Sequence, residues 1–262
     1  DSAPPRDHAG TDALARACAA WLARLPTHLG FAPAATDALG RFWARERESL
    51  RTLLAHVRAD LDHVHAVAAH GARRSNRTDA LMRALAAGHI PPDWHCYATP
   101  RGTPVAAWID DLAARVAQAA AAPDTVAPGL TVRPSAFLTA TRQVAALHLR
   151  ASLDALVPHV RLGVADAPTP TSFALAGVRI DGGTWDAHVL RLNDGTSTDV
   201  ACTLEWTLAP PPRAPQTAHT AHTAELAMYT NAERQEVLVY AAIPVDAAPE
   251  TVIQRGVALR TA

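Results

Sequence analysis

The stretch FWARERESLRTLLAHVRADLDHV occupies residues 42–64 and decides how the first half of the chain folds. Its apolar residues recur three and four positions apart, which places them along one side of an α-helix. The positions between them carry Arg, Glu and Asp, so the opposite side is charged. We therefore predict a long amphipathic helix over residues 37–69, with Gly71 as its C-cap.

The same periodicity predicts shorter helices on both sides of this one. Thr11 and Ser152 are the expected N-caps of the first and the last of them, because a hydroxyl can accept from the free backbone N–H groups of a helix start. The residues GLTV at 129–132 are expected to be extended. The further predicted helices cover residues 11–25, 78–87, 104–122, 134–150 and 152–157.

After Pro158 the apolar pattern changes to the alternation that is typical of strands. Gly182–Gly183 and Asn193–Gly195 are expected turns, and a helical turn over 249–256 precedes a terminal strand at 257–260. Short strands with tight connections favour an antiparallel sheet or barrel, so the predicted class is α+β, helical first and β second. The other expected strands cover residues 159–165, 172–180, 184–192, 201–209, 225–230 and 236–243.

The composition indicates a folded protein that does not bind nucleic acid. Hydrophobic residues make up 49% of the 262 residues, and the net charge is −1, without the basic excess of a nucleic-acid binder. All 24 basic residues are Arg. Cys18, Cys96 and Cys202 are far apart and odd in number, which favours reduced thiols in the cytosol. We expect neither a signal peptide nor a membrane span, and the start at Asp1 without Met suggests a piece of a longer or processed protein.

Few residues suggest chemistry. There is no phosphate-binding GxxxxGK[ST] loop, no GxSxG nucleophile motif and no HExxH helix. His56, Asp60 and His63 could share one helix face as metal ligands, although the solvated side of a charged helix is the favoured interpretation. His219 and His222 lie in the repetitive stretch TAHTAHTA, which favours a flexible connection over a metal site. The residues alone indicate an α+β domain without a visible active site.

Several stretches nevertheless resemble, in order, the C-terminal domain of dynein heavy chains. IPPDWHCY at 90–97 and TPVAAWIDDLAARV at 103–116 are similar to a family pattern of Pro–x–x–Trp followed by a Trp–[VI]–x–Asp–[LF]–x–x–Arg helix. The other similar stretches are PSAFLTATRQ at 134–143, SLDAL at 152–156, GVRIDGGTWD at 177–186 and QRGVAL at 254–259. The residues around Thr139 favour the cytoplasmic over the axonemal type. The matching positions are Trp94, Trp108, Asp111, Arg115, Phe137, Thr139, Gln143, Gly177, Gly182, Trp185, Arg255 and Gly256.

The resemblance implies a helical part followed by an incomplete antiparallel β-barrel. It implies a junction with the first helix at residues 1–36, a helical subdomain at 37–157 and a barrel-like subdomain at 158–262. It also implies no catalytic residue, cofactor or metal in this chain, since ATP and Mg²⁺ would bind to the motor ring of the parent protein. The matching positions are expected to be structural.

The implied partners are the AAA+ ring modules of the same heavy chain, and, through the parent motor, dynein subunits and microtubules. The implied role is to modulate processivity and force of minus-end-directed movement in the cytoplasm, at the cytoskeleton, without nucleic acid or membrane. We expect the long helix and the Trp108 helix to form the docking side, with Trp21, Trp43 and Trp94 partly in the interface. Two alternatives stay open: a metal-assisted hydrolase using His56, Asp60 and His63, and a free-standing scaffold or adaptor.

Overall fold

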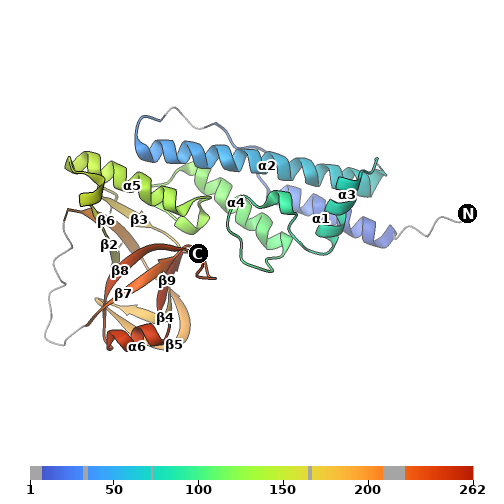
Figure 1. Cartoon of the computed structure of the whole chain (residues 1–262). Coiled ribbons are helices and arrows are strands. Elements are labelled where there is room, and N and C mark those ends of the chain that lie inside the picture. The colour runs from blue at the N-terminus through green and yellow to red at the C-terminus, as the bar shows by residue number, and fades with distance from the viewer. Residues whose placement is uncertain (1–7, 32–34, 72, 165–166, 209–221, 262) are drawn as a thin grey trace, which may run out of the picture. The chain divides into compact units, whose positions relative to one another are not determined.

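The structure, a computed structural model, describes residues 8–31, 35–71, 73–164, 167–208 and 222–261 (Figure 1). The polypeptide forms two compact units. The first comprises Asp1–Pro33 and Arg45–Ala121, and the second comprises Ala34–Ala44 and Ala122–Ala262. The long helix α2 (Ala38–His70) contributes residues to both. The subdomain boundaries that the resemblance implies stay a prediction.

The first unit is built from helices around the apolar side of α2. That side is buried as its periodicity predicts, with Leu50, Leu54, Val57, Leu61 and Val64 almost fully removed from solvent. Gly71 follows α2 with a φ of +68°, the conformation expected of a glycine C-cap. The other helices of this unit are α1 (His8–Arg24), α3 (Asn76–Ala86), the 3₁₀ turn η1 (Pro92–Trp94) and α4 (Val105–Ala121).

Arginines on the charged side of α2 bind the ends of neighbouring helices. Arg58 Nη1 donates to the carbonyl oxygens of Leu22, Leu25 and Pro26, where α1 ends. Arg47 donates to the carbonyls of Ala119 and Ala120 at the end of α4, at 2.6 and 2.7 Å. The last carbonyls of a helix lack intrahelical partners and carry partial negative charge, so these guanidinium groups satisfy and stabilise them. The charged side of α2 therefore also holds the ends of α1 and α4.

The second unit combines two sheets with helix α5 (Pro134–Leu149). One sheet has the strand order β1–β3–β6–β2, from strands at Thr125–Val126, Ser172–Leu175, Cys202–Thr207 and Val157–Leu162. The second runs β4–β5–β8–β7–β9 and back to β4. Its strands are Val178–Asp186, Val189–Asp199, Val237–Val245, His222–Tyr229 and Ala258–Thr261. Helix α6 (Pro249–Gln254) precedes β9.

The helices and sheets confirm the α+β class, and the ring of five strands has one weak seam. β5 and β8 pair only at Leu190 and Val245, so the ring is weakly joined on that side. Most pairings are antiparallel, but β5–β8, β7–β9 and β1–β3 are parallel, so both sheets are mixed. Buried residues of the strands, α5 and the start of α2 form one core, which includes Phe42, Phe137 and Trp206.

Three local predictions in the helical half are wrong. Thr11 lies inside α1, which already includes His8, so it is not the N-cap. The GLTV stretch is not extended, because Pro128–Leu130 form the 3₁₀ turn η2. The helix expected after Ser152 is a single 3₁₀ turn, η3 (Leu153–Ala155), since Val157 already pairs in β2.

The strand predictions are wrong at several glycine and turn positions. The expected strand 172–180 is divided at Gly177, whose φ is +66°, and its two parts enter different sheets. Gly182 and Gly183 do not form a turn but a bulge inside β4. The hairpin instead turns between Asp186 and Val189, where Ala187 has a φ of +51°, and Asn193–Gly195 lie within β5. His219 lies outside the described residues, whereas His222, expected in a flexible connection, is the first residue of β7 and pairs with Val245.

Candidate functional site

The carboxylate of Asp60 is the centre of a polar cluster in the first unit. Its side chain is only 6% exposed and accepts two bonds from Arg77, at 2.8 and 3.1 Å, and one from Trp94 Nε1 at 3.0 Å. His56 Nε2 lies 3.3 Å from the same carboxylate. Burial raises the pKa of the Asp60 carboxyl, but the bonds from Arg77 and Trp94, together with nearby positive charge, outweigh it and hold the pKa below its usual value.

This geometry contradicts a metal site at His56, Asp60 and His63. The cationic guanidinium of Arg77 binds Asp60 and also lies 3.0 Å from His56 Nε2, so it occupies the place of a metal ion. His63 Nε2 instead contacts Thr78 Oγ1 at 3.0 Å. In residues 8–261, apart from the undescribed gaps, no three His, Cys, Asp or Glu side chains are placed to hold a metal. The favoured solvated interpretation is also wrong for Asp60, which is buried.

The family-pattern residues of η1 and α4 form an aromatic stack next to Asp60. The Trp94 and Trp108 rings stack with centroids 5.3 Å apart, and Tyr97 stacks on Trp108 at 5.9 Å. The Arg115 guanidinium lies over the Tyr97 ring, 3.9 Å from its centroid, and binds Asp111 at 2.7 Å. Burial, followed by the Asp111 charge, raises the pKa of the Tyr97 hydroxyl. Trp94 and Trp108 are fully buried, so they stabilise this unit and are not free for an interface.

Helix α5 has one buried and one exposed side. Phe137 is fully buried and packs on Phe42 with ring centroids 5.7 Å apart. Buried Thr141 accepts a hydrogen bond from Trp206 Nε1 at 3.1 Å. Thr139 is exposed and donates to the Ser135 carbonyl of its own helix. Two residues of the family pattern, Phe137 and Thr139, therefore lie on opposite sides of α5.

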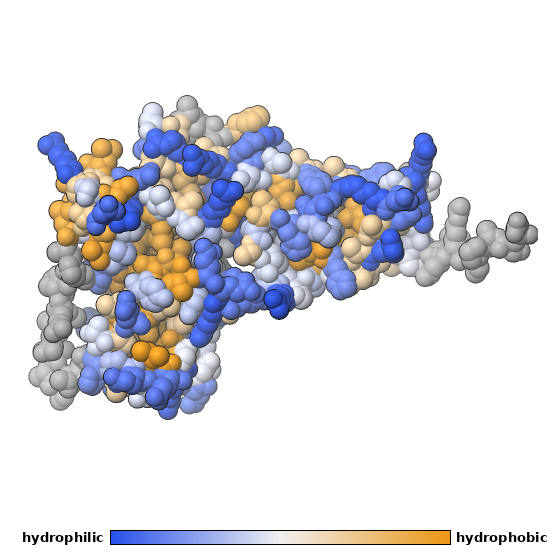
Figure 2. Space-filling model, in the orientation of Figure 1, coloured by the Kyte–Doolittle hydropathy of each residue, from blue (hydrophilic) through white to orange (hydrophobic). Residues whose placement is uncertain are grey.

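Gln143, the third family-pattern residue of α5, lies in a shallow apolar surface. We name it the α5 surface and define it by its lining residues, Gln143, Ala146, Leu147, Arg150, Ala151 and Leu153. Leu147 is 80% exposed and Leu153 is 39% exposed. Figure 2 shows hydrophobic side chains gathered over the C-terminal end of α5. The two leucines are exposed, so they contribute little to the core of the unit. Because apolar side chains that gather on a surface often mark a binding site, the α5 surface is the candidate interaction site.

The glycines and Trp185 of the family pattern shape the barrel. Gly182 allows the bulge in β4 with a φ of +78°. Trp185 is half-buried and packs so closely on Gly163 that a Cβ there would overlap its indole Nε1. Gly177, with its positive φ, lets the backbone leave β3 and enter β4. Gly177 and Gly182 have backbone conformations that favour glycine, and Trp185 needs a neighbour without a side chain. These three family-pattern positions therefore shape the backbone and the packing of the barrel.

Gly256 ends α6 in a Schellman motif. Its φ is +67°, its N–H donates to Ile253 O at 2.9 Å, and the N–H of Val257 donates to Val252 O at 3.2 Å. Arg255 is exposed beside it. The motif turns the backbone into β9, whose residues 258 and 259 are buried.

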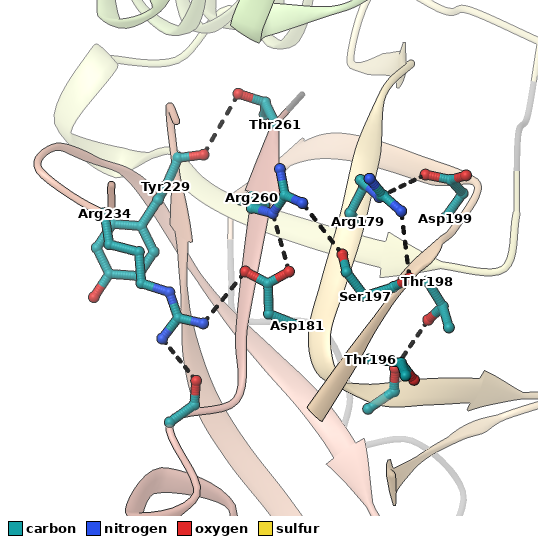
Figure 3. A network of polar contacts seen from close by, with 12 residues as sticks. Arg179, Asp181, Thr196, Ser197, Thr198, Asp199, Tyr229, Arg234, Arg260 and Thr261 are labelled. Atoms are coloured by element: carbon teal, nitrogen blue, oxygen red, sulfur yellow. Dashed lines mark hydrogen bonds and ion pairs between the residues drawn. The ribbon is translucent and has the colours of Figure 1, made fainter. Parts of the chain in front are cut away.

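An ion network that the sequence did not reveal joins the barrel strands around Asp181 (Figure 3). Arg260 of β9 binds this carboxylate at 3.0 Å, and Arg234, from the β7–β8 connection, binds it at 3.3 Å. Arg234 also donates to the Gly256 carbonyl at 2.7 Å. Burial raises the pKa of Asp181, but bonds from Arg260, Ser197 and Arg234 outweigh it and lower the pKa. Asp181, which directly precedes the expected Gly182–Gly183 turn, is therefore a structural anion.

Two of the three cysteine thiols are held in the protonated form by burial. Cys18 and Cys202 are buried, and burial raises the pKa of each to about 12, which keeps them protonated. No helix in the described part of the protein is both long and apolar enough to span a bilayer.

Comparison with known proteins identifies a family. A family model for the C-terminal domain of dynein heavy chains matches residues 3–261. The sequence is 28% identical over 272 residues to a cytoplasmic dynein heavy chain of Drosophila melanogaster, covering 95% of this chain and 6% of that protein. It is 33% identical over 153 residues to the Caenorhabditis elegans protein of the same name, covering 56% of this chain and 3% of the relative.

The cytoplasmic dynein heavy chain of Dictyostelium discoideum is 26% identical over 219 residues, which cover 80% of this chain and 5% of that protein. The present polypeptide thus corresponds to only a small fraction of each relative's length. All three relatives agree with the resemblance to the cytoplasmic type. Because the family model covers nearly every residue, this chain belongs to the family of C-terminal domains of dynein heavy chains.

Proposed function

We propose that this chain is a non-catalytic regulatory domain that packs on AAA+ ring modules of its own heavy chain. The observation that carries the proposal is the α5 surface, where Leu147 is 80% exposed. Exposed leucines are common singly, but here two lie together with Ala146 and Ala151 in one hollow. Burying both leucines against a partner would contribute roughly 3 kcal/mol, enough for a specific contact when polar groups at its edge are also paired.

The polar edge of the α5 surface supports a protein partner. Gln143 can donate and accept, and the exposed Arg150 can bind a carboxylate or a helix C-terminus. Arg150 stands at the C-cap of α5 with a φ of +52°, so its backbone position is set by the helix end. An apolar centre with polar groups at the edge is the common composition of protein interfaces.

In this proposal the domain acts mechanically. A contact that differs between ring states would let the domain limit or relay ring movement and so change the processivity and force of minus-end-directed movement. ATP and Mg²⁺ would bind in the ring modules, and microtubules and other dynein subunits would be reached only through the parent motor. The domain would act in the cytoplasm, at the cytoskeleton, as the names of the relatives suggest.

A binding experiment tests the proposed surface. The whole 262-residue polypeptide is titrated against a parent motor that lacks its own C-terminal domain, and the dissociation constant is measured. Replacing Leu147 and Leu153 by Asn should weaken binding at least tenfold, since both lose apolar contact area. The matched control is Ile253→Asn on α6, which removes an apolar side chain whose exposure, 61%, lies between those of the two leucines, and which should leave the affinity unchanged.

Equal affinity of the wild type and the Leu147/Leu153 variant would contradict a role of the α5 surface. Absence of any binding to the ring would contradict the proposed function itself and would favour the free-standing adaptor. Circular dichroism spectra of both variants should match that of the wild type, because the replaced side chains are exposed.

A further inference from the structure

The second unit contains a separate hollow of about 370 Å³. It lies among the start of α2, residues 122–126, α5 and the segment that leads into β3. Four of its apolar lining residues are buried, namely Trp43, Val126, Phe137 and Phe173. The outer residues include Pro168 and Pro170, which are exposed. This hollow shares no lining residue with the α5 surface.

Two carboxylates, Asp37 and Asp124, lie at the exposed edge of this hollow, and no lining residue is basic. Asp37 is held in place because its Oδ1 accepts the N–H of Gly40 at 2.6 Å, which makes it the N-cap of α2. Within the described residues, neither carboxylate forms an ion pair. The hollow thus combines an apolar floor with two carboxylates at its edge, one of which also caps α2.

This combination selects a ligand with an apolar stem and a cationic end. A neutral apolar group would cover the floor but would partly desolvate two carboxylates that have no cationic partner, and an anion would be repelled. Arginine fits better than lysine because its planar guanidinium can bind carboxylates through paired hydrogen bonds, is weakly hydrated and packs on aromatic rings. Its methylene stem can lie on the apolar floor while the charge stays near the edge.

We infer that the hollow receives an arginine side chain presented by another polypeptide segment. The inference goes beyond the proposed function, because it uses different residues and does not depend on where the α5 surface docks. The occupant is a protein segment with an exposed arginine, held by charge complementarity at the edge and apolar contact below.

The test uses N-acetyl-arginine-amide as the probe and NMR of the whole 262-residue polypeptide as the measurement. Saturable shifts are expected for the Trp43 indole N–H and the Gly40 amide. The neutral isostere N-acetyl-citrulline-amide should bind about tenfold more weakly, because it lacks the charge that two partly exposed carboxylates attract. N-acetyl-lysine-amide should lie between the two.

The double variant Asp37→Asn/Asp124→Asn should weaken arginine binding about fivefold or more, since it removes both charges. Asn at position 37 keeps an oxygen that accepts the Gly40 N–H, so α2 keeps its cap. The matched control Asp194→Asn removes one exposed charge from β5 and should leave binding unchanged. The inference is overturned by equal binding of arginine and citrulline, by undiminished binding to the double variant, or by the absence of saturable shifts.

Discussion

The indole Nε1 of Trp94 donates a hydrogen bond to Oδ2 of Asp60 at 3.0 Å, and both residues are buried. This bond joins η1 to the middle of α2. It also places Trp94 so that its ring stacks on Trp108. Trp94 of the family pattern is thus oriented by an aspartate of the long helix α2, and Trp108 packs on the oriented ring.

Replacing Asp60 by Ala should lower the free energy of unfolding by about 2 kcal/mol or more, because the buried Trp94 N–H loses its acceptor. Urea unfolding followed by circular dichroism measures this. The control is Asp62→Ala on the same helix, where the side chain is exposed and the expected change is below about 0.5 kcal/mol. Equal effects at the two positions would show that Asp60 is not a structural anion.

The same carboxylate predicts a dependence of stability on pH. The pKa of Asp60 is lower in the folded protein than its usual value of 3.8, so its ionised form stabilises the fold above about pH 4. That contribution is lost as the pH falls through the folded pKa. The unfolding free energy should therefore decrease below about pH 4, and Asp60→Asn should decrease less steeply than the wild type.

The pKa of Asp181 is also lowered in the folded protein. The Asp60→Asn variant should therefore still lose part of its unfolding free energy at low pH, because Asp181 is still present. Adding Asp181→Asn should remove more of this decrease in stability at low pH. Parallel profiles for the wild type and both variants would refute this account of acid stability.

Arg47 should contribute to stability although it belongs to the charged side of α2. Arg47→Ala leaves the carbonyls of Ala119 and Ala120 without their donors, and we expect a loss of about 1 to 2 kcal/mol in urea unfolding. Arg45→Ala, two residues away and exposed, is the matched control with an expected change within about 0.5 kcal/mol. An equal loss at both positions would mean that capping of α4 is unimportant.

Substitutions at two glycines of positive φ distinguish the cost of backbone strain from the cost of a steric overlap. Gly195→Ala, at a φ of +87° with open space around it, should cost about 1 kcal/mol from strain alone. Gly163→Ala, at a φ of +76°, should cost more, because the new Cβ would also overlap the Trp185 indole. Thermal unfolding of both variants checks the order, and a smaller effect at Gly163 would contradict close packing by Trp185.

Local sequence patterns predicted the helical half well. The period of α2 and the glycine C-cap at Gly71 depend only on nearby residues, and both agree with the structure. The strand half was predicted less well because Gly182 permits either a turn or a bulge, and only pairing with β5 and β9 decides between them. Likewise, nothing local shows that β3 and β4 belong to different sheets.

The candidate sites were harder to predict than the fold. Asp60 has the spacing of a charged-side residue, and its partners Arg77 and Trp94 meet it only after the backbone has folded back. Similarly, Asp181 is followed by two glycines and meets Arg260 from the end of the sequence. The family patterns include Gln143 but do not predict that Leu147 is exposed. The exposure of a side chain depends on how the rest of the unit packs around it, which a local pattern does not contain.

The central claim is that the α5 surface carries mechanical coupling to the ring, and single-molecule motility of the parent motor tests it most directly. Run length and stall force are compared for the wild type, Leu147→Asn/Leu153→Asn and the control Ile253→Asn. We predict that the double variant changes both quantities as deletion of the whole domain does, whereas the control matches the wild type. The claim would be contradicted if deletion of the domain clearly changes run length and stall force but the double variant moves like the wild type.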